Sequence, residues 1–533
     1  MDSNPDSNPD AAPSATVTVA TSRSAPDTAV HLTFRSGTVV VEEADGAIRV
    51  EHPANTFVLR QVPERVRRTL LRMATGSVTP DAHTQADQAG PIALPPSLAL
   101  VIGRLERLVE YRVPDASGKD ALAVETMVCE SRHQPLPPSR DVPLRLSRFA
   151  YLRREADGLV LESPNSARRV RLLNSRAAGL IAALGTATTV TELTGGLGLS
   201  EAEAIRLTSH LIGAALVEQA ADADGAFPED SDTARQWSFH DMLFHSRSRM
   251  GRHDYPIGGV FPFMDEIPPT PAVRPAFRGP SIALPHPDLT TVLAADPPLT
   301  AALEARRSIR KVGRDPITLR QLGEFLYRTA RIRSLTDQDA EQPIPYAATS
   351  RPYPSGGATY DLEFYLTLRR CLGAEPGIYH YDPLAHRLVL VNADPADRTR
   401  LLERAVRATS GGTLPDALIT LTSRFQRLSW KYAGMAYATT LKHVGVAYQT
   451  MYLIATAMKL APCALGNGDS SQAEKILGLD RLRESSVGEF MLSAATPPSA
   501  LPARRTSWRP ANGHDWHTIA TERLHSQPST HNG

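Results

Sequence analysis

The sequence predicts an α+β protein, in which a C-terminal domain with a mostly antiparallel sheet flanked by helices follows two tandem winged-helix-like units. Five strand-like segments alternate with helical ones toward the C-terminus, and they are DLEFYLTLRR (361–370), GIYHYD (377–382), RLVLVN (387–392), ALITLTSRF (417–425) and VGEFMLS (487–493). A similar stretch also occurs twice near the N-terminus, around Glu43–Gly46 and around Glu155–Gly158. Strands and helices mixed in this way are typical of α+β domains.

Length and composition limit the classes to which the protein can belong. With 533 residues the chain is too long for one core and should contain about three domains. Its 42% hydrophobic and 22% charged residues are typical of a globular protein, and a net charge of +1 gives no basic surface for nucleic acid or an anionic membrane. The most hydrophobic segment, 448–465, is interrupted by Lys459 and Pro462, which favours a buried helix over a membrane span.

Cysteine usage and the N-terminal sequence indicate the compartment. Three widely spaced cysteines (Cys129, Cys371 and Cys463) form neither a disulfide framework nor a zinc motif. The opening MDSNPDSNPD lacks the basic and apolar regions of a secretory signal. We therefore expect a cytoplasmic protein.

The repeated stretch defines the two N-terminal units, 29–135 and 141–222. Each copy predicts a strand, an Asp-Gly turn, a second strand and then helices, which is the outline of a winged helix. The candidate recognition helix carries Glu201, Glu203 and Glu218, which disfavours DNA binding. Clamping of an extended peptide at the hairpin edge is the favoured function, and a role as dimer scaffolding stays open.

The other segments are assigned by composition. They are a disordered tail rich in Asp, Ser, Asn and Pro (1–28), a Pro-rich connector (223–298), the C-terminal domain (299–495) and a C-terminal tail (496–533). Three histidines of the connector, His240, His245 and His253, are not set in the carboxylate and cysteine pattern of a metal site. We therefore expect polar packing there and predict no metal.

One long apolar helix, predicted over 437–460, lies in the C-terminal domain. Apolar residues occupy nearly all of its faces, so it should be buried. A thin polar stripe of Lys442, Gln449 and Thr456 remains, and we expect this stripe to face a bound molecule. The glycine-containing turn that follows the helix would let backbone approach a ligand closely, and it consists of Ala464, Leu465 and Gly466.

An arginine-rich cluster opens the C-terminal domain, and it consists of Arg306, Arg307, Ser308, Ile309 and Arg310. Arg306 and Arg310 are four residues apart, so on a helical turn they would project to one side. Guanidinium groups and a serine hydroxyl suit a phosphate group. Taken alone, such a cluster is more often a solvated helix end.

Two further motifs are candidates for a site. Pro354, Ser355, Gly356 and Gly357 combine a stiffening proline with glycines that permit close backbone approach to a flat ring, although a plain turn is the alternative. Lys431 and Tyr432 follow a predicted strand and, from the residues alone, are either a surface pair or part of a site. There is no Gly-x-Gly-x-x-Gly after a strand and no Walker lysine, so neither a dinucleotide fold nor an ATP site is indicated.

The order of these motifs, RRSIR, PSGG and SWKYAGMAYATTLKHVGVAYQTMYLIATAMKLAPCALGNGD, resembles the SagB-type azoline dehydrogenases, a branch of the flavin-dependent nitroreductase superfamily. The resemblance covers 237–493 well and the N-terminal repeat only in outline. It implies a nitroreductase-like domain that binds FMN within a homodimer. The arginine cluster would hold the FMN phosphate and ribityl chain, and the PSGG glycines and the 464–466 turn would lie against the ring.

The resemblance also implies a reaction. Lys431 would take a proton from a thiazoline or oxazoline ring, with Tyr432 as relay or positioning residue, although the two roles could be exchanged. FMN would accept the hydride, and oxygen would reoxidise the flavin. The substrate would be a ribosomally made precursor peptide whose rings a partner cyclodehydratase has closed.

Two alternatives remain open. One is a nitroreductase or flavin reductase that uses NAD(P)H, and the other is a non-catalytic scaffold of a peptide-modifying complex. The sequence departs from the family pattern at three positions that concern flavin or interface contacts. The family tends to have proline where Asp361 stands, arginine where Ala438 stands and an acidic residue where His443 stands.

Overall fold

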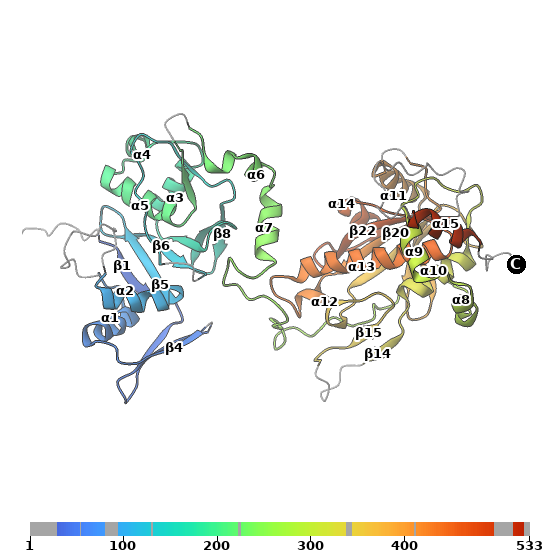
Figure 1. Ribbon diagram of the computed structural model, residues 1–533, viewed down its shortest axis with the longest axis horizontal. Coiled ribbons are helices and arrows are strands. Elements are labelled where there is room, and N and C mark those ends of the chain that lie inside the picture. Colours follow the sequence, from blue (N-terminus) through green and yellow to red (C-terminus); the bar gives the residue numbers. More distant parts are fainter. Residues whose placement is uncertain are drawn as a thin grey trace, which may run out of the picture. The chain divides into compact units, whose positions relative to one another are not determined.

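The computed structural model describes residues 29–53, 55–79, 94–128, 132–221, 225–336, 344–409, 412–494 and 515–526. The chain divides into an N-terminal unit, Met1–Asp254, and a C-terminal unit, Tyr255–Gly533 (Figure 1). The predicted disorder of 1–28 and most of the predicted tail lie outside the described residues.

The N-terminal unit is built around a six-stranded antiparallel sheet with the order β1-β5-β6-β10-β9-β8. Its strands are β1 (His31–Phe34), β5 (Val109–Pro114), β6 (Asp120–Thr126), β8 (Tyr151–Glu155), β9 (Gly158–Glu162) and β10 (Arg168–Leu172). The unit also contains a meander of β2 (Val39–Glu42), β3 (Ile48–His52) and β4 (Asn55–Leu59), and a pair of β7 (Leu144–Leu146) and β11 (Val217–Gln219). Its helices are α1 (Glu64–Thr75), α2 (Pro96–Leu105), α3 (Ser175–Ala183), α4 (Val190–Leu197), α5 (Glu201–Gly213), α6 (Asp232–Arg235) and α7 (Phe239–Arg247).

The two copies of the repeat have the same local order. Each forms a three-stranded meander followed by a helix, β2-β3-β4-α1 and β8-β9-β10-α3, so the predicted hairpins around Glu43–Gly46 and Glu155–Gly158 are confirmed. Strand β6 of the first copy pairs with β10 of the second, and buried residues of both copies form one hydrophobic core. The assignment of the copies as winged helices stays a prediction.

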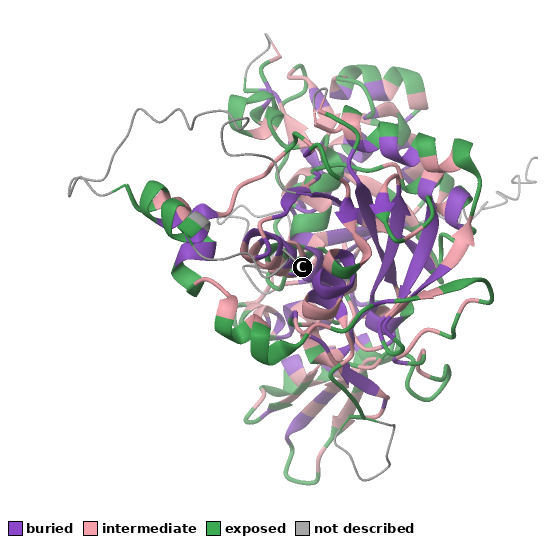
Figure 2. Cartoon of the chain, turned by 90° about the vertical axis from the view of Figure 1, so that its right-hand side faces the viewer, coloured by how far each residue is buried: buried purple, intermediate pink, exposed green. Residues whose placement is uncertain are grey.

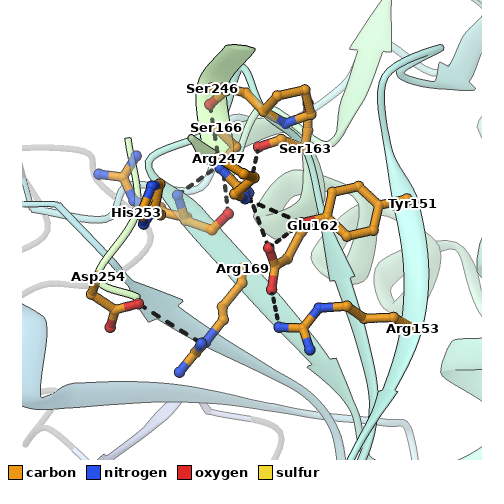
Figure 3. A network of polar contacts seen from close by, with 12 residues as sticks. Tyr151, Arg153, Glu162, Ser163, Ser166, Arg169, Ser246, Arg247, His253 and Asp254 are labelled. Atoms are coloured by element: carbon orange, nitrogen blue, oxygen red, sulfur yellow. Dashed lines mark hydrogen bonds and ion pairs between the residues drawn. The ribbon is translucent and has the colours of Figure 1, made fainter. Parts of the chain in front are cut away.

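A buried carboxylate ties α7 to this sheet. Glu162 on β9 accepts hydrogen bonds from the Tyr151 hydroxyl (2.6 Å), from Arg153 (2.8 Å) and from Arg247 of α7 (2.9 Å), and these three side chains converge on it in Figure 3. Burial and the Glu162 charge raise the pKa of Tyr151, so its phenol keeps the proton that it donates.

A pair of buried histidines predicts that the stability of the N-terminal unit depends on pH. His133 Nε2 and His210 Nδ1 lie 2.9 Å apart, and both side chains are buried. Burial lowers the pKa of His210 to about 4 and lowers the pKa of His133 well below its usual range. As the pH falls from about 6.5 toward the lowered values, the unfolded chain takes up protons that the folded unit does not, so the unit should lose about 1.4 kcal/mol of stability per histidine and pH unit.

Urea unfolding followed by circular dichroism across this pH range measures the loss. The control is His240→Ala, which removes a histidine of α7 whose side chain is 82% exposed, and it should leave the profile unchanged. A wild-type profile that stays flat between neutral pH and pH ~5 would contradict the prediction.

The C-terminal unit contains a seven-stranded sheet with the order β12-β19-β18-β16-β20-β22-β21, and every neighbouring pair is antiparallel. Its strands are β12 (Ser281–Ala283), β16 (Leu362–Leu368), β18 (Gly377–Asp382), β19 (Arg387–Asn392), β20 (Ala417–Arg424), β21 (Ala461–Ala464) and β22 (Glu484–Ser493). The predicted antiparallel sheet is therefore confirmed. Two small pairs lie outside it, β13 (Ile317–Thr318) with β17 (Cys371–Leu372) and β14 (Ser334–Thr336) with β15 (Ala348–Ser350).

Helices cover both faces of this sheet, which accounts for its almost fully buried central strands (Figure 2). The helices of the unit are α8 (Leu289–Ala295), α9 (Leu299–Ala305), α10 (Leu319–Ala330), α11 (Pro395–Arg407), α12 (Gln426–Ser429), α13 (Ala436–Ala457), α14 (Ser470–Leu477) and α15 (Trp516–Ser526). Helices α10 and α13 pack on the face that contains Ile419, and α11 and α14 pack on the face that contains Leu418. The two faces alternate along β20 because successive side chains of a strand point to opposite sides.

The structure corrects two predictions about helices. The arginine cluster is not on a helical turn: α9 ends at Ala305, and the extended chain beyond it donates a backbone hydrogen bond from Ile309 N to Pro462 O of β21 (2.8 Å). Helix α13 is not buried on all sides, because only one of its faces packs on the sheet, and the side chains of Tyr437 and Leu441 are exposed.

Near the C-terminus, α15 packs against the start of the unit. Ala520 of α15 contacts Ala301 and Ala305 of α9, and His517 Nδ1 donates to Glu304 O (2.8 Å). None of the helices in the described part of the chain has the length and apolar character that a membrane span requires.

Candidate active site

Lys431, the lysine of the predicted catalytic pair, contacts the loop formed by Pro354, Ser355, Gly356 and Gly357, which we call the glycine loop. Strand β20 leads into the short helix α12 and then into Lys431 and Tyr432. Lys431 Nζ donates a hydrogen bond to the Tyr346 hydroxyl (2.7 Å), which in turn donates to Gly357 O (2.6 Å). Burial raises the pKa of Tyr346, so this phenol stays protonated and keeps both roles. The sequence-predicted Lys431, Tyr432 and Gly357 therefore lie together.

Aromatic rings surround the Lys431 amine. Its Nζ lies 5.1 Å from the ring centres of Tyr346 and Tyr432 and 5.8 Å from that of Phe261. Among the described residues no carboxylate lies within ion-pair distance of Lys431. The amine is therefore held by one hydrogen bond and by ring faces, an environment in which its position is defined without a counter-ion.

A segment from the start of the C-terminal unit fixes the backbone of the pair. Gly258 and Ala433 exchange two backbone hydrogen bonds (3.2 and 3.0 Å), and Phe261 N donates to Lys431 O (3.0 Å). The buried Trp430 donates from Nε1 to Ile267 O (2.6 Å). Sequence reasoning missed both Phe261 and Tyr346, because neither belongs to a recognisable motif.

Arg427 of α12 binds the backbone beside Tyr346 and the backbone that follows the glycines. Its guanidinium donates to three carbonyl oxygens, Thr359 O (2.8 Å), Thr270 O (2.7 Å) and Ala347 O (3.1 Å). Burial, and next the nearby Arg424, lower the pKa of Arg427 to about 10, so it remains charged at neutral pH.

The glycine loop needs its glycines. Gly357 has a φ of +60°, and a methyl group there would overlap Lys431 Nζ and lie 2.8 Å from the Tyr432 hydroxyl. A Cβ on Gly356 would lie 3.3 Å from Thr439 and 3.4 Å from His443 Nε2. Ser355 Oγ accepts a hydrogen bond from Tyr360 N (3.0 Å), while Pro354 is exposed.

Gly357→Ala should therefore displace Lys431 and abolish function of the site. The added methyl group forces the lysine away, and the left-handed backbone costs about 1 kcal/mol for a non-glycine residue. Catalytic turnover and thermal stability measure the two effects. Gly103→Ala on α2 is the control, because a Cβ there also meets no atom within 4 Å and the helix belongs to the N-terminal unit, and it should be harmless to both. Full activity of Gly357→Ala would show that Lys431 does not act from this position.

The arginine cluster and the turn after α13 meet at Tyr452 of α13. The Tyr452 hydroxyl is 2.7 Å from Ser308 Oγ and accepts a hydrogen bond from Ala464 N (2.8 Å). The Arg306 guanidinium lies 5.0 Å from the centre of the Tyr452 ring. Leu465 N donates to Glu489 O of β22 (2.9 Å). Two motifs far apart in the sequence thus form one local structure.

Other predicted site residues stand apart from these contacts. Gln449 is exposed on α13, and of its predicted stripe Lys442 is also exposed whereas Thr456 is buried. The three residues of the stripe thus differ in exposure, and its contact with a bound molecule stays a prediction. Gly466 is exposed and has no atom within 4 Å of an added Cβ, which leaves open space beside the turn. Arg307 and Arg310 belong to the same extended segment as Arg306.

Two family models match the chain. The nitroreductase family matches residues 303–492, which confirms the predicted nitroreductase-like domain, and the cyanobactin oxidase ThcOx family matches residues 144–254. The second range contains the network around Glu162.

Individual relatives are more distant. The nitroreductase-like protein MJ1384 of Methanocaldococcus jannaschii is 27% identical over 199 residues, covering 37% of this chain and 91% of that protein. The microcin B17-processing protein McbC of Escherichia coli is 29% identical over 140 residues (25% of this chain, 49% of McbC). The trifolitoxin-processing protein TfxB of Rhizobium leguminosarum bv. trifolii is 27% identical over 142 residues (26% of this chain, 38% of TfxB). The chain thus spans half or less of McbC and TfxB.

A solved structure of the E. coli microcin synthetase McbBCD complex with truncated pro-MccB17 bound contains a chain that is 22% identical. The match covers 36% of this chain and 68% of that chain, with a TM-score of 0.29. The chain is a nitroreductase-family protein that also contains a cyanobactin oxidase ThcOx domain, and it is distantly similar to McbC and TfxB.

Proposed function

We propose that this protein is an FMN-dependent azoline dehydrogenase, which oxidises thiazoline or oxazoline rings of a ribosomally made precursor peptide to thiazoles or oxazoles. The observation that carries the proposal is the position of Lys431: its amine contacts Tyr346 and lies against Gly357 of the loop that would cover the flavin ring. The ThcOx match and the similarity to McbC and TfxB support the same reaction class.

The residues present fit FMN, which members of the nitroreductase fold bind. Arg306 and Arg310 have no carboxylate within ion-pair distance among the described residues, so their guanidinium groups suit a phosphate. Lys431 and Tyr432 lie directly against Gly357, so a ring held by this loop would be next to both side chains, and open space lies beside Gly466. His443 and Tyr452 are nine positions apart on α13, so the loop and the arginine cluster lie about 13 Å apart along the helix axis.

The chain's own groups would carry the proton chemistry. Oxidation of an azoline removes a proton from one ring carbon and a hydride from its neighbour. Bound FMN would accept the hydride and pass the electrons to oxygen. Lys431, as the neutral amine, would take the proton, and Tyr346 would orient the lysine Nζ through their hydrogen bond. The Tyr432 hydroxyl, close to Gly357, would position the ring or relay the proton.

The proposal includes partners. A partner cyclodehydratase would close the rings before this enzyme acts, and the similar protein McbC belongs to a synthetase complex, McbBCD, that binds a precursor peptide. The exposed side chains of Tyr437 and Leu441 on α13 suit a homodimer interface, and the N-terminal unit would hold the peptide. Analytical ultracentrifugation of the FMN-loaded protein tests the dimer.

Incubation with FMN and a cyclodehydrated peptide tests the reaction. Mass spectrometry should show the loss of two hydrogen atoms per azoline ring. One molecule of oxygen should be consumed for each ring that is oxidised. The uncyclised peptide is the control and should keep its mass. A yellow protein that leaves every azoline intact would refute the activity for that peptide, and a colourless protein would favour a scaffold.

The similarity to MJ1384 over 91% of that protein favours a second candidate, an NAD(P)H-dependent nitroreductase or flavin reductase. Anaerobic addition of NADPH discriminates between the two. Rapid bleaching of the flavin by NADPH would favour the reductase. In an azoline dehydrogenase, the azoline peptide should bleach the flavin instead.

A further inference from the structure

A buried histidine holds the glycine loop by its backbone. Gly356 N donates a hydrogen bond to His443 Nε2 of α13 (2.7 Å), and His443 Nδ1 lies 2.6 Å from Asp361 Oδ1. Both side chains are almost fully buried, with 4% of His443 and 0% of Asp361 exposed. The contact therefore links the loop, through one imidazole, to a carboxylate at the start of β16.

The hydrogen bonds define the histidine tautomer. A backbone N–H can only donate, so Nε2 carries its lone pair toward Gly356 and Nδ1 carries the hydrogen that Asp361 accepts. The other carboxylate oxygen of Asp361 accepts from the hydroxyls of Ser423 (2.6 Å) and Thr440 (3.1 Å). Every polar atom of the pair that these contacts involve is thus satisfied away from water.

We propose that His443 and Asp361 form a positioning pair, which fixes the Gly356 peptide so that the glycine backbone presents a constant edge to the FMN ring. The inference rests on the proposed function for the identity of that ring. The Gly356 N–H donates to His443, so it is not available to a ligand. The neighbouring Gly357 N–H is the backbone donor of the two glycines that remains for a ligand. His443 and Asp361 would affect FMN binding through the position of the loop and would not touch FMN themselves.

The hydrogen bond between His443 and the loop depends on Asp361. A carboxylate at 443 would accept the Gly356 N–H without help, whereas a buried neutral imidazole leaves Nδ1–H in need of an acceptor. Asp361 supplies that acceptor.

The affinity for FMN, measured by quenching of flavin fluorescence, tests the pair. H443A and D361A should each weaken FMN binding about ten- to hundred-fold, since each removes a hydrogen bond to a charged or buried group. The double variant should be little weaker than the worse single variant, because the two residues act as a unit. H443Q, whose amide oxygen can accept the Gly356 N–H, should retain most of the affinity.

H380A is the matched control, because His380 is also a buried histidine paired with a carboxylate (Nε2 to Glu363 Oε2, 3.0 Å), on the neighbouring strand β18. It should lose stability but keep FMN affinity. Unchanged affinity in folded H443A, or an equal loss in H380A, would overturn the inference, as would additive losses in the double variant.

Hydrogen exchange of the FMN-free protein gives a readout that needs neither flavin nor azoline. The Gly356 amide should be protected in the wild type and exposed in H443A, and H380A should resemble the wild type. If H443A does not fold, the wild type alone decides: a Gly356 amide that exchanges like an unbonded one would overturn the proposal. Failure to convert azolines, with these effects intact, would instead refute only the proposed function.

Discussion

Lys431→Ala is expected to slow azoline oxidation by about a hundred- to ten-thousand-fold, the range over which a general base contributes. The alanine removes the amine that contacts the Tyr346 hydroxyl and lies against Gly357, and burial keeps the neighbouring Tyr346 phenol protonated by raising its pKa. FMN binding should persist, because the loop keeps its contact with His443. Single-turnover reduction of the flavin by an azoline peptide measures the chemical step directly.

Two further substitutions separate the base from the charge. Lys431→Arg keeps a cation but cannot lose its proton near neutral pH, so it should be as inactive as Lys431→Ala. Lys442→Ala is the matched control, because this lysine is exposed on α13 and should be dispensable. An active Lys431→Arg would show that the lysine stabilises charge and that another group takes the proton.

Asp416→Ala should destabilise the C-terminal unit by about 2–4 kcal/mol, because two backbone amides lose their acceptor and two partly exposed arginines lose their carboxylate. Asp416 is fully buried just before β20, and its carboxylate binds Arg369 and Arg370. It also accepts backbone hydrogen bonds from Ile317 N (3.2 Å) and Ala494 N (3.0 Å). The alanine would leave both amides without their acceptor, whereas Arg369 and Arg370 would lose the carboxylate but keep hydrogen bonds to backbone carbonyl oxygens.

Urea unfolding followed by the fluorescence of the buried Trp430 reports on this unit. Glu403→Ala is the control, because Glu403 is an exposed carboxylate on α11 of the same unit and its loss should change stability by less than about 0.5 kcal/mol. If Asp416→Ala unfolds at the same urea concentration as the wild type, the buried carboxylate does not hold these segments together.

Local patterns in the sequence predicted the sheet of the C-terminal unit well. The alternating apolar residues of β16, β18, β19, β20 and β22 fall on two buried faces, so their strand character shows in the sequence itself. The prediction for α13 was right in type and close in bounds, but its apolar outer face misled the burial estimate. A helix face that is apolar yet exposed cannot be told from a buried one by periodicity alone.

Long-range contacts explain the remaining differences. The arginine cluster leaves the helical conformation because Ile309 bonds to Pro462, more than a hundred positions away, and no local signal announces that partner. Tyr346 and Phe261 reach Lys431 from segments with no motif of their own. His443 and Asp361 were visible as departures, but their direct contact was not.

The pairing of β6 with β10 has a consequence for how the N-terminal repeat can be dissected. A duplication normally yields modules that can be cut apart, shuffled or lost one at a time. Here each copy supplies the neighbour strand of the other, along five paired positions from Arg168–Thr126 to Leu172–Leu122. Removal of either copy would leave the other with an unpaired edge strand, and an exposed edge strand promotes aggregation. The two copies should therefore be expressed together, because each completes the sheet of the other.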